Sequence, residues 1–139
     1  MSAFRIEADA SAETMAQVQA GLGAFNRAAT GVLADPRQIN LAAWDGDKLI
    51  GGIIGRVFID AAYLDIVWVD EVARGQGLGR ALMAKAEEDG LRAGANYVWL
   101  NTLSWQARPF YEKLGYRVFG ELPVMDNKHR RYFMCKDLT

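Results

Sequence analysis

Arg74 to Ala81 is the stretch of this chain whose residue types could do chemistry, since it reads Arg-Gly-Gln-Gly-Leu-Gly-Arg-Ala. It follows an apolar run, Tyr63 to Val69, and leads into a helical pattern, so the residues predict a strand, a glycine turn and a helix start. Because glycine has no Cβ, such a turn can direct successive backbone N–H groups into one concavity. The helix N-terminus adds unpaired donors and roughly half a unit of positive charge. The pattern therefore indicates a cradle for an anion.

The spacing of the glycines excludes two common phosphate sites. The dinucleotide fingerprint needs a third glycine where this chain has Arg80, and the P-loop needs glycine and lysine where it has Arg80 and Ala81. The pattern that fits is Arg or Gln, any two residues, Gly, any residue, then Gly or Ala. Arg74, Gly77 and Gly79 meet it.

A second patterned segment, Asn101 to Tyr116, follows further along the chain. From Ala107 it reads Ala-Arg-Pro-Phe-Tyr-Glu-Lys-Leu-Gly-Tyr. Two motifs in this order and spacing make chance a poor explanation. On these two segments the chain resembles the GNAT superfamily of N-acetyltransferases, strongly over residues 63–120 and loosely at both ends.

The resemblance implies both a fold and a domain organisation. The expected fold is α/β, with a mixed, mostly antiparallel sheet of six to seven strands. Helices are expected on both faces of the sheet, and a central pair of parallel strands is expected to splay apart. A single domain over residues 1–139 is expected.

The resemblance also implies that acetyl-CoA is the co-substrate and that the glycine turn holds its pyrophosphate. The backbone of Gln76 to Arg80 is expected to contact the pyrophosphate, and the side chains of Arg74 and Arg80 to add charge-assisted bonds to phosphate. Asn101 is expected against the pantetheine arm, although an Asn at a strand end is equally an ordinary turn former. The expected cofactor-binding residues are Val67, Trp68, Val69, Arg74, Gly75, Gln76, Gly77, Leu78, Gly79, Arg80, Asn101, Ala107, Phe110 and Tyr111.

The implied reaction moves an acetyl group from the thioester to a primary amine by direct attack in a ternary complex. It needs an N–H donor for the developing oxyanion, a proton for the departing thiolate and a group that takes the amine's proton. Val69 N–H is the expected oxyanion donor and Tyr111 the expected general acid. One face of the strand over residues 61–69 is expected to carry Tyr63, Asp65, Val67 and Val69, and Asp65 is the candidate base. Glu71, His129 and a water molecule are the alternatives.

The elements that must position these residues follow from periodicity and turn residues. Asp45-Gly46-Asp47 between two apolar runs predicts a hairpin, and Ser11 predicts the N-cap of a first helix. The helix after the glycine turn is expected to end at Gly90 or, in the preferred interpretation, just before Gly94, and Gly115 is expected to end a short helix. The predicted strands are residues 4–8, 39–44, 48–57, 61–69, 96–102, 116–120 and 131–136, and the predicted helices are residues 11–29, 78–93 and 106–114.

Composition bounds the partners of the protein. With 139 residues and 51% hydrophobic residues the chain is long and apolar enough for one domain with a real core. Its formal net charge of -1 gives no field of one sign, so we expect neither nucleic acid nor an anionic membrane as partner. The expected acceptor is a small molecule or a peptide amine.

Compartment and metal content follow from other features of the sequence. The first residues lack the apolar core of a signal peptide, and no apolar run approaches the ~20 residues of a membrane helix, so a cytoplasmic location is expected. Cys135 is the single cysteine of the sequence, which excludes an internal disulfide. His129 is the single histidine, so the sequence has no His/Cys cluster and indicates no metal site.

Two alternatives to this activity stay open. The first is a non-catalytic domain that binds or senses acyl-CoA, which Tyr111 argues against because binding does not need a general acid. The second is a longer acyl donor, with a pocket set by Gly51 and Gly52. A homodimer is expected from the resemblance alone.

Overall fold

The computed structural model describes residues 3–32 and 35–139 of the chain. Contacts divide it into two compact units, Met1–Asp35 and Pro36–Thr139. Among the described residues, no helix is long and apolar enough to cross a membrane.

The first unit contains one helix, α1 (Ala12–Thr30). Its predicted N-cap is confirmed, because the Ser11 hydroxyl accepts a hydrogen bond from the backbone N–H of Thr14. None of the residues of α1, all of them described, is buried. The strand predicted over residues 4–8 is wrong: this segment is irregular and exposed, and an alternating pattern does not make a strand without a neighbouring strand to pair with.

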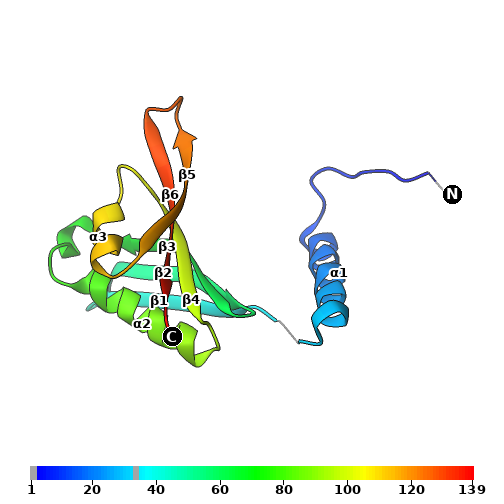
Figure 1. The fold of residues 1–139 in the computed structure, drawn as a ribbon, viewed down its shortest axis with the longest axis horizontal. Coiled ribbons are helices and arrows are strands. Elements are labelled where there is room, and N and C mark those ends of the chain that lie inside the picture. The colour runs from blue at the N-terminus through cyan, green and yellow to red at the C-terminus, as the bar shows by residue number, and fades with distance from the viewer. Residues whose placement is uncertain (1–2, 33–34) are drawn as a thin grey trace. The chain divides into compact units, whose positions relative to one another are not determined.

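The second unit is built on one mixed sheet. Among its described residues six strands pair in the order β1-β2-β3-β4-β6-β5, with β3 and β4 parallel and the other neighbours antiparallel (Figure 1). This confirms the expected mostly antiparallel sheet with its central parallel pair. The strands are β1 (Arg37–Asp45), β2 (Lys48–Phe58), β3 (Ala61–Val69), β4 (Tyr97–Leu103), β5 (Arg117–Val124) and β6 (His129–Asp137).

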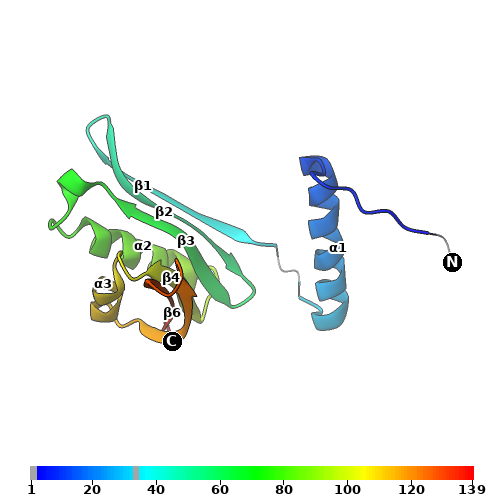
Figure 2. The ribbon, with the colours of Figure 1, turned by 90° about the horizontal axis from the view of Figure 1, so that it is seen from above.

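Two helices connect these strands, and both cover the same face of the sheet (Figure 2). They are α2 (Leu78–Arg92), between β3 and β4, and α3 (Arg108–Lys113), between β4 and β5. We call this face the helix face and the opposite one the far face. Leu82, Met83 and Ala86 of α2 are buried against the helix face. A helix on the far face stays a prediction, since α1 belongs to the other unit.

The core lies between the helix face and the two helices. Its largest fully buried side chains come from β2, β3, α2, β4 and β6, and they are Ile53, Leu64, Met83, Val98, Leu100 and Met134. Burying such side chains is worth about 1.5–3 kcal/mol each relative to exposure. This core fixes the strands and helices that carry the site.

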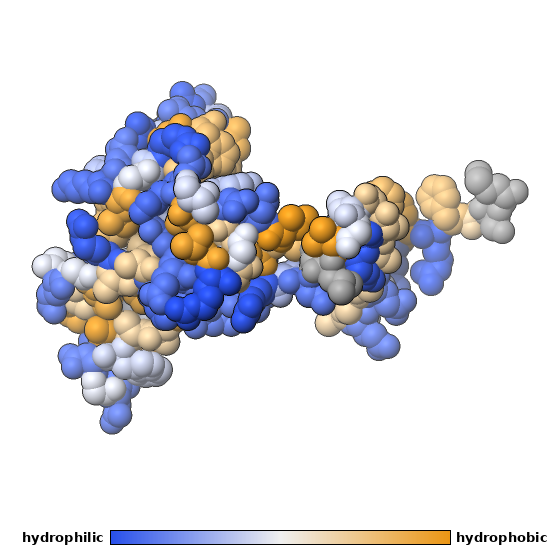
Figure 3. Space-filling view, turned by 60° about the horizontal axis from the view of Figure 1, so that its bottom comes forward, coloured by the Kyte–Doolittle hydropathy of each residue, from blue (hydrophilic) through white to orange (hydrophobic). Residues whose placement is uncertain are grey.

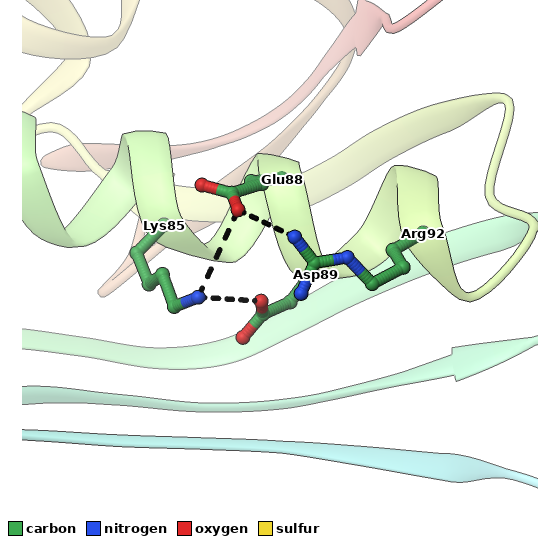
Figure 4. Close-up of polar contacts among 4 residues, drawn as sticks. All are labelled: Lys85, Glu88, Asp89 and Arg92. Atoms are coloured by element: carbon green, nitrogen blue, oxygen red, sulfur yellow. Dashed lines mark hydrogen bonds and ion pairs between the residues drawn. The ribbon is translucent and has the colours of Figure 1, made fainter.

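The outer side of α2 carries a small network of ion pairs (Figure 4). Lys85 pairs with Asp89 at 3.1 Å, and Arg92 pairs with Glu88 at 2.7 Å. Exposed pairs at this helical spacing contribute only about 0.3–0.5 kcal/mol each. Polar side chains also cover much of the surface of residues 36–139 in Figure 3, with smaller apolar patches between them.

Candidate active site

The glycine turn folds as the sequence predicts, between a short helical turn η1 (Glu71–Ala73) and α2. Gly75 and Gly77 have φ angles of 79° and 82°, a left-handed conformation that other residues rarely adopt. Gly77 is the N-cap of α2 and provides no side chain to accept from the first backbone N–H groups. The N-terminus of α2 therefore presents unpaired donors, as an anion site requires.

Gly79 brings the two sequence motifs together. A Cβ at this position would lie 3.1 Å from Cζ of Phe110, closer than side chains normally pack. Glycine at this position lets the ring of Phe110, on α3, pack against the first turn of α2 without shifting. The two segments that carry the resemblance therefore form one wall.

A slot opens beside this wall where β3 and β4 separate. The two strands pair only from Ala61 to Leu64 and from Tyr97 to Leu100, and beyond these pairs β4 continues with β6 alone. The separation coincides with a β-bulge, because Leu64 pairs with Gly55 and Ile66 with Ile54, which leaves Asp65 as the extra residue. The splayed parallel pair expected from the sequence is thus present.

The bulge corrects one prediction about the faces of β3. Val67 lies opposite the buried Ile53, so Val67 and Val69 face the helices, whereas Ile66 and Trp68 lie on the far face. Tyr63 lies on the far face too, since its partner Arg56 is on the same face of β2 as Ile54, the partner of Ile66. The prediction that Tyr63, Asp65, Val67 and Val69 share one face is therefore wrong, because Asp65 is an extra residue and reverses the alternation.

A cavity of about 890 Å³ occupies the slot and the space beside the glycine turn. Pockets for small molecules and cofactors usually measure about 300–1,000 Å³, so this one is large enough for an extended ligand. Both faces of β3 contribute to its wall. The lining residues are Leu64, Asp65, Ile66, Val67, Trp68, Val69, Ala73, Arg74, Gly75, Gly77, Leu78, Gly79, Arg80, Leu100, Asn101, Thr102, Trp105, Gln106, Ala107, Phe110 and Tyr111.

Nearly all of the site residues predicted from the sequence line this cavity. Gln76 does not, because its side-chain amide donates instead to the carbonyl of Val72 within the turn. Gly51 and Gly52, expected to set the acyl pocket, are not among the lining residues either. The lining residues that the sequence did not predict are Leu64, Ile66, Ala73, Leu100, Thr102, Trp105 and Gln106. Trp105 and Gln106 stand inside the second motif, so that segment could have indicated them.

Arg74 has a structural contact that the sequence did not indicate. Its Nε donates a hydrogen bond of 3.2 Å to the carbonyl oxygen of Val69, which ties the glycine turn to the end of β3. The next backbone N–H, of Asp70, donates to Ile50 on β2. Since successive N–H groups of an extended strand point to opposite sides, the N–H of Val69 is directed away from β2 and toward the slot.

Tyr111 stands on α3 in the wall of the cavity and is only 6% exposed. Its ring packs edge-on against that of Tyr116, with 5.9 Å between ring centroids. Burial raises the pKa of the Tyr111 hydroxyl to about 12, because a phenolate is costly away from water. Tyr111 therefore keeps its proton at neutral pH.

The three side chains considered as bases lie in different places. Asp65 lines the cavity, whereas Glu71 and His129 do not. His129 lies at the start of β6, where its Nδ1 is 3.0 Å from the hydroxyl of Ser104 and its ring meets Trp105 edge-on. Asp65 is therefore the candidate that the geometry favours.

Comparisons with known proteins show the family of the chain. The family model described as "Acetyltransferase (GNAT) family" matches residues 7–116, and so spans parts of both units. A blasticidin-S acetyltransferase of Streptomyces morookaense is 36% identical over 98 residues, which cover 70% of this chain and 72% of that protein.

Solved structures give the same result. An acetyltransferase from Agrobacterium tumefaciens superposes with a TM-score of 0.83 at 27% identity, over 98% of this chain and 99% of that one. A Bacillus anthracis protein described as a streptothricin acetyltransferase, solved in complex with acetyl coenzyme A, shares the fold with a TM-score of 0.66 at 23% identity. The match covers 74% of this chain and 64% of that one.

Proposed function

The chain belongs to the acetyltransferase (GNAT) family, and from this premise we propose that it is an acetyl-CoA-dependent N-acetyltransferase acting on a primary amine. The observation that carries the proposal is the continuous cavity, which runs from the glycine turn to both faces of β3. A thioester reaching the slot along the helix face and an amine arriving from the far face would meet there. Direct attack in a ternary complex requires such a meeting point.

The glycine turn fits the pyrophosphate of acetyl-CoA. A Cβ at Gly75 or Gly77 would meet no atom within 4 Å, so the turn leaves open space beside the unpaired N–H groups of α2. Backbone donors and the helix dipole stabilise phosphate there, and Arg80 can add a charge-assisted bond. When bound, acetyl-CoA supplies the thioester carbonyl.

Three groups of the chain would then perform the chemistry. The N–H of Val69 donates a hydrogen bond to the carbonyl oxygen as negative charge develops on it. Asp65 takes the proton of the attacking amine, and Tyr111 gives its proton to the departing thiolate. Tyr111 suits this role because its raised pKa keeps the hydroxyl protonated while a thiolate, with pKa near ~8.5 for a free thiol, is forming.

The relative from Streptomyces suggests the first acceptor to test. That protein is named for blasticidin S, and Trp68 and Trp105, each about half exposed in the cavity wall, could pack against a planar ring. We propose blasticidin S as the first member of an amine panel that also includes aminoglycosides and peptides with a free N-terminus.

Thiol release from acetyl-CoA, measured for each amine with a mass increase of one acetyl group on the product, tests the proposal. We expect Tyr111→Phe to bind acetyl-CoA like the wild type but to turn over about 100-fold more slowly, because the ring remains and the acid is lost. Binding of acetyl-CoA with no transfer to any amine would instead favour the non-catalytic acyl-CoA sensor.

We also propose that residues 1–139 act as one domain. The support is the family model, whose match crosses the boundary between the two units. Deletion of residues 1–35 should therefore reduce turnover. Full activity of residues 36–139 alone would contradict the proposal.

A further inference from the structure

Four polar side chains meet on the far face of the sheet where the slot begins. Asp65 and Asn101 line the cavity, whereas Tyr63 and Arg131 do not. Tyr63 and Asp65 belong to β3, Asn101 to β4 and Arg131 to β6. Asn101 lies between the buried Leu100 and Thr102, so its side chain is on the far face. Three strands that are distant in the sequence therefore bring these groups together.

Hydrogen bonds join the four residues in one direction. The guanidinium of Arg131 can only donate, and it donates to Oδ1 of Asn101. This fixes the orientation of the amide, whose Nδ2 then donates to the hydroxyl oxygen of Tyr63 at 3.4 Å. The hydroxyl proton of Tyr63 is left to donate to Oδ1 of Asp65, also at 3.4 Å. The chain of donors runs from Arg131 to Asp65.

The ring of Tyr63 is held by its neighbours. The ring packs on that of Trp99 at a tilt of 34°, with 4.1 Å between ring centroids. The guanidinium of Arg56, on β2, lies 5.1 Å from the centroid of the Tyr63 ring. Stacking and the cation–π contact fix the plane of the ring. The hydroxyl is therefore presented to Asp65 from a defined position.

Asp65 needs such a partner because it is the extra residue of the bulge. It has no paired residue on β2, and a bulge re-aims the side chain that it carries. Its contact with Tyr63, at 3.4 Å, is longer than the roughly 2.5–3.0 Å of a typical O–H···O bond, and an ionised carboxylate can accept about four bonds. The carboxylate is thus oriented but still able to accept from an incoming amine.

We propose that Tyr63 is a positioning residue that orients Asp65 toward the acceptor amine, and that Arg131 and Asn101 hold Tyr63 in this role. The inference rests on the proposed function, in which Asp65 takes the proton of the amine. It adds three residues that act through Asp65 and that neither sequence motif assigns to this step.

Tyr63→Phe tests the proposal because it removes the hydroxyl and keeps the ring that stacks on Trp99. We expect kcat to fall about tenfold, the usual effect of losing a hydrogen bond to a charged group, with an unchanged Kd for acetyl-CoA. Tyr97→Phe is the matched control. Tyr97 is the first residue of the segment in which β4 pairs with β3, at the end away from the slot, and it does not line the cavity. An unchanged kcat in Tyr63→Phe would overturn the proposal.

A double-mutant cycle separates positioning from a merely structural role. If Tyr63 acts through Asp65, Tyr63→Phe should change kcat less than about twofold in an Asp65→Asn background. Additive effects would overturn the positioning role while leaving the proposed function intact. If the wild type acetylates no amine in the panel, the proposed function fails, and the positioning role fails with it.

Asn101→Asp tests the direction of the chain. The new side chain still accepts from Arg131 but cannot donate to Tyr63, whose hydroxyl would then turn away from Asp65. We expect the same loss of kcat as in Tyr63→Phe. Wild-type kcat in Asn101→Asp, with a loss in Tyr63→Phe, would show that Asn101 takes no part and would overturn the chain as proposed.

Discussion

The two faces of the slot are built in different ways. On the helix face, the wall comes from the glycine turn and from α3. The turn offers backbone N–H donors, and α3 adds the hydroxyl of Tyr111. On the far face, the polar groups are the side chains of Tyr63, Asp65, Asn101 and Arg131, which three strands supply.

This difference decides what a substitution does. In the glycine turn of the helix face, a new side chain changes the shape and charge of a cradle made of backbone, so we expect it to alter binding of the cofactor. On the far face a substitution removes one functional group from a scaffold that stays in place, so we expect it to alter turnover. The following predictions test this division, from the largest effect to the smallest.

Gly77→Asp should nearly abolish binding of acetyl-CoA. A carboxylate about 4 Å from a phosphate repels it by about 4 kcal/mol near a protein surface, which corresponds to at least a 100-fold loss of affinity. Gly77→Asn is the matched control, because Asn and Asp tolerate the left-handed conformation of this position about equally and differ in charge. The measurement is the thermal shift caused by acetyl-CoA. Equal losses in both variants would contradict an electrostatic cradle.

Asp65→Asn should lower kcat about 100-fold, as loss of a general base does, and leave the affinity for acetyl-CoA unchanged. Glu71→Gln serves as the control, since Glu71 was the alternative acid on the chain and does not line the cavity. Steady-state kinetics with an acetylated amine of the panel give the comparison. If kcat falls in Glu71→Gln and not in Asp65→Asn, the assignment of Asp65 as the base is wrong.

Tyr111→Phe should make stability less sensitive to alkali, which would show that the helix face is the drier one. The folded-state pKa of Tyr111 is about 12, against about 10 when unfolded, so its contribution is complete below pH 10 and is lost as pH rises through 12. At pH 11 the wild type should have lost about 1.4 kcal/mol on this account. Urea unfolding of both proteins at pH 8 and pH 11 measures the difference. A loss of equal size in the variant would refute the assignment.

Arg74→Ala should have the smallest effect, because it removes one hydrogen bond, from Arg74 Nε to the carbonyl of Val69. Such a bond contributes about 1 kcal/mol, or roughly fivefold in kcat/KM. Arg74→Gln keeps an amide donor for the same carbonyl and should lose less than about twofold. If both variants lose the same amount, the charge of Arg74, rather than its tie to β3, is what the site uses.

The sequence predicted much of the helix face. The glycine turn, the helix that begins at Leu78, the hairpin at Asp45-Gly46-Asp47 and the helix ended by Gly115 all form as expected. Each depends on neighbours within a few residues, so local conformational preferences and turn chemistry are enough to specify it. Of the predicted cofactor residues, Gln76 alone does not line the cavity, because its side-chain amide donates to the carbonyl of Val72 within the same turn.

The far face was predicted poorly. Alternation placed Tyr63 on one face with Val67 and Val69, and the bulge at Asp65 reversed it. The contact that joins Arg131 to Asn101 and Tyr63 was not predicted, because Arg131 is 68 positions from Tyr63 in the sequence and reaches Asn101 only through the pairing of β4 with β6. The prediction of a strand at residues 4–8 was wrong for a similar reason, since the sequence of a segment does not reveal whether another strand is available to pair with it.

The family, the predicted anion cradle and the candidate acid could all be read from the sequence, since each rests on residues close together in the chain. Which faces of β3 the residues take, where the slot opens and which side chains surround Asp65 became clear from the three-dimensional arrangement. The physical reason is that helices and turns are specified by local contacts. Strand register and bulges depend on pairing between distant segments, and a shift of one residue moves every following side chain to the opposite face.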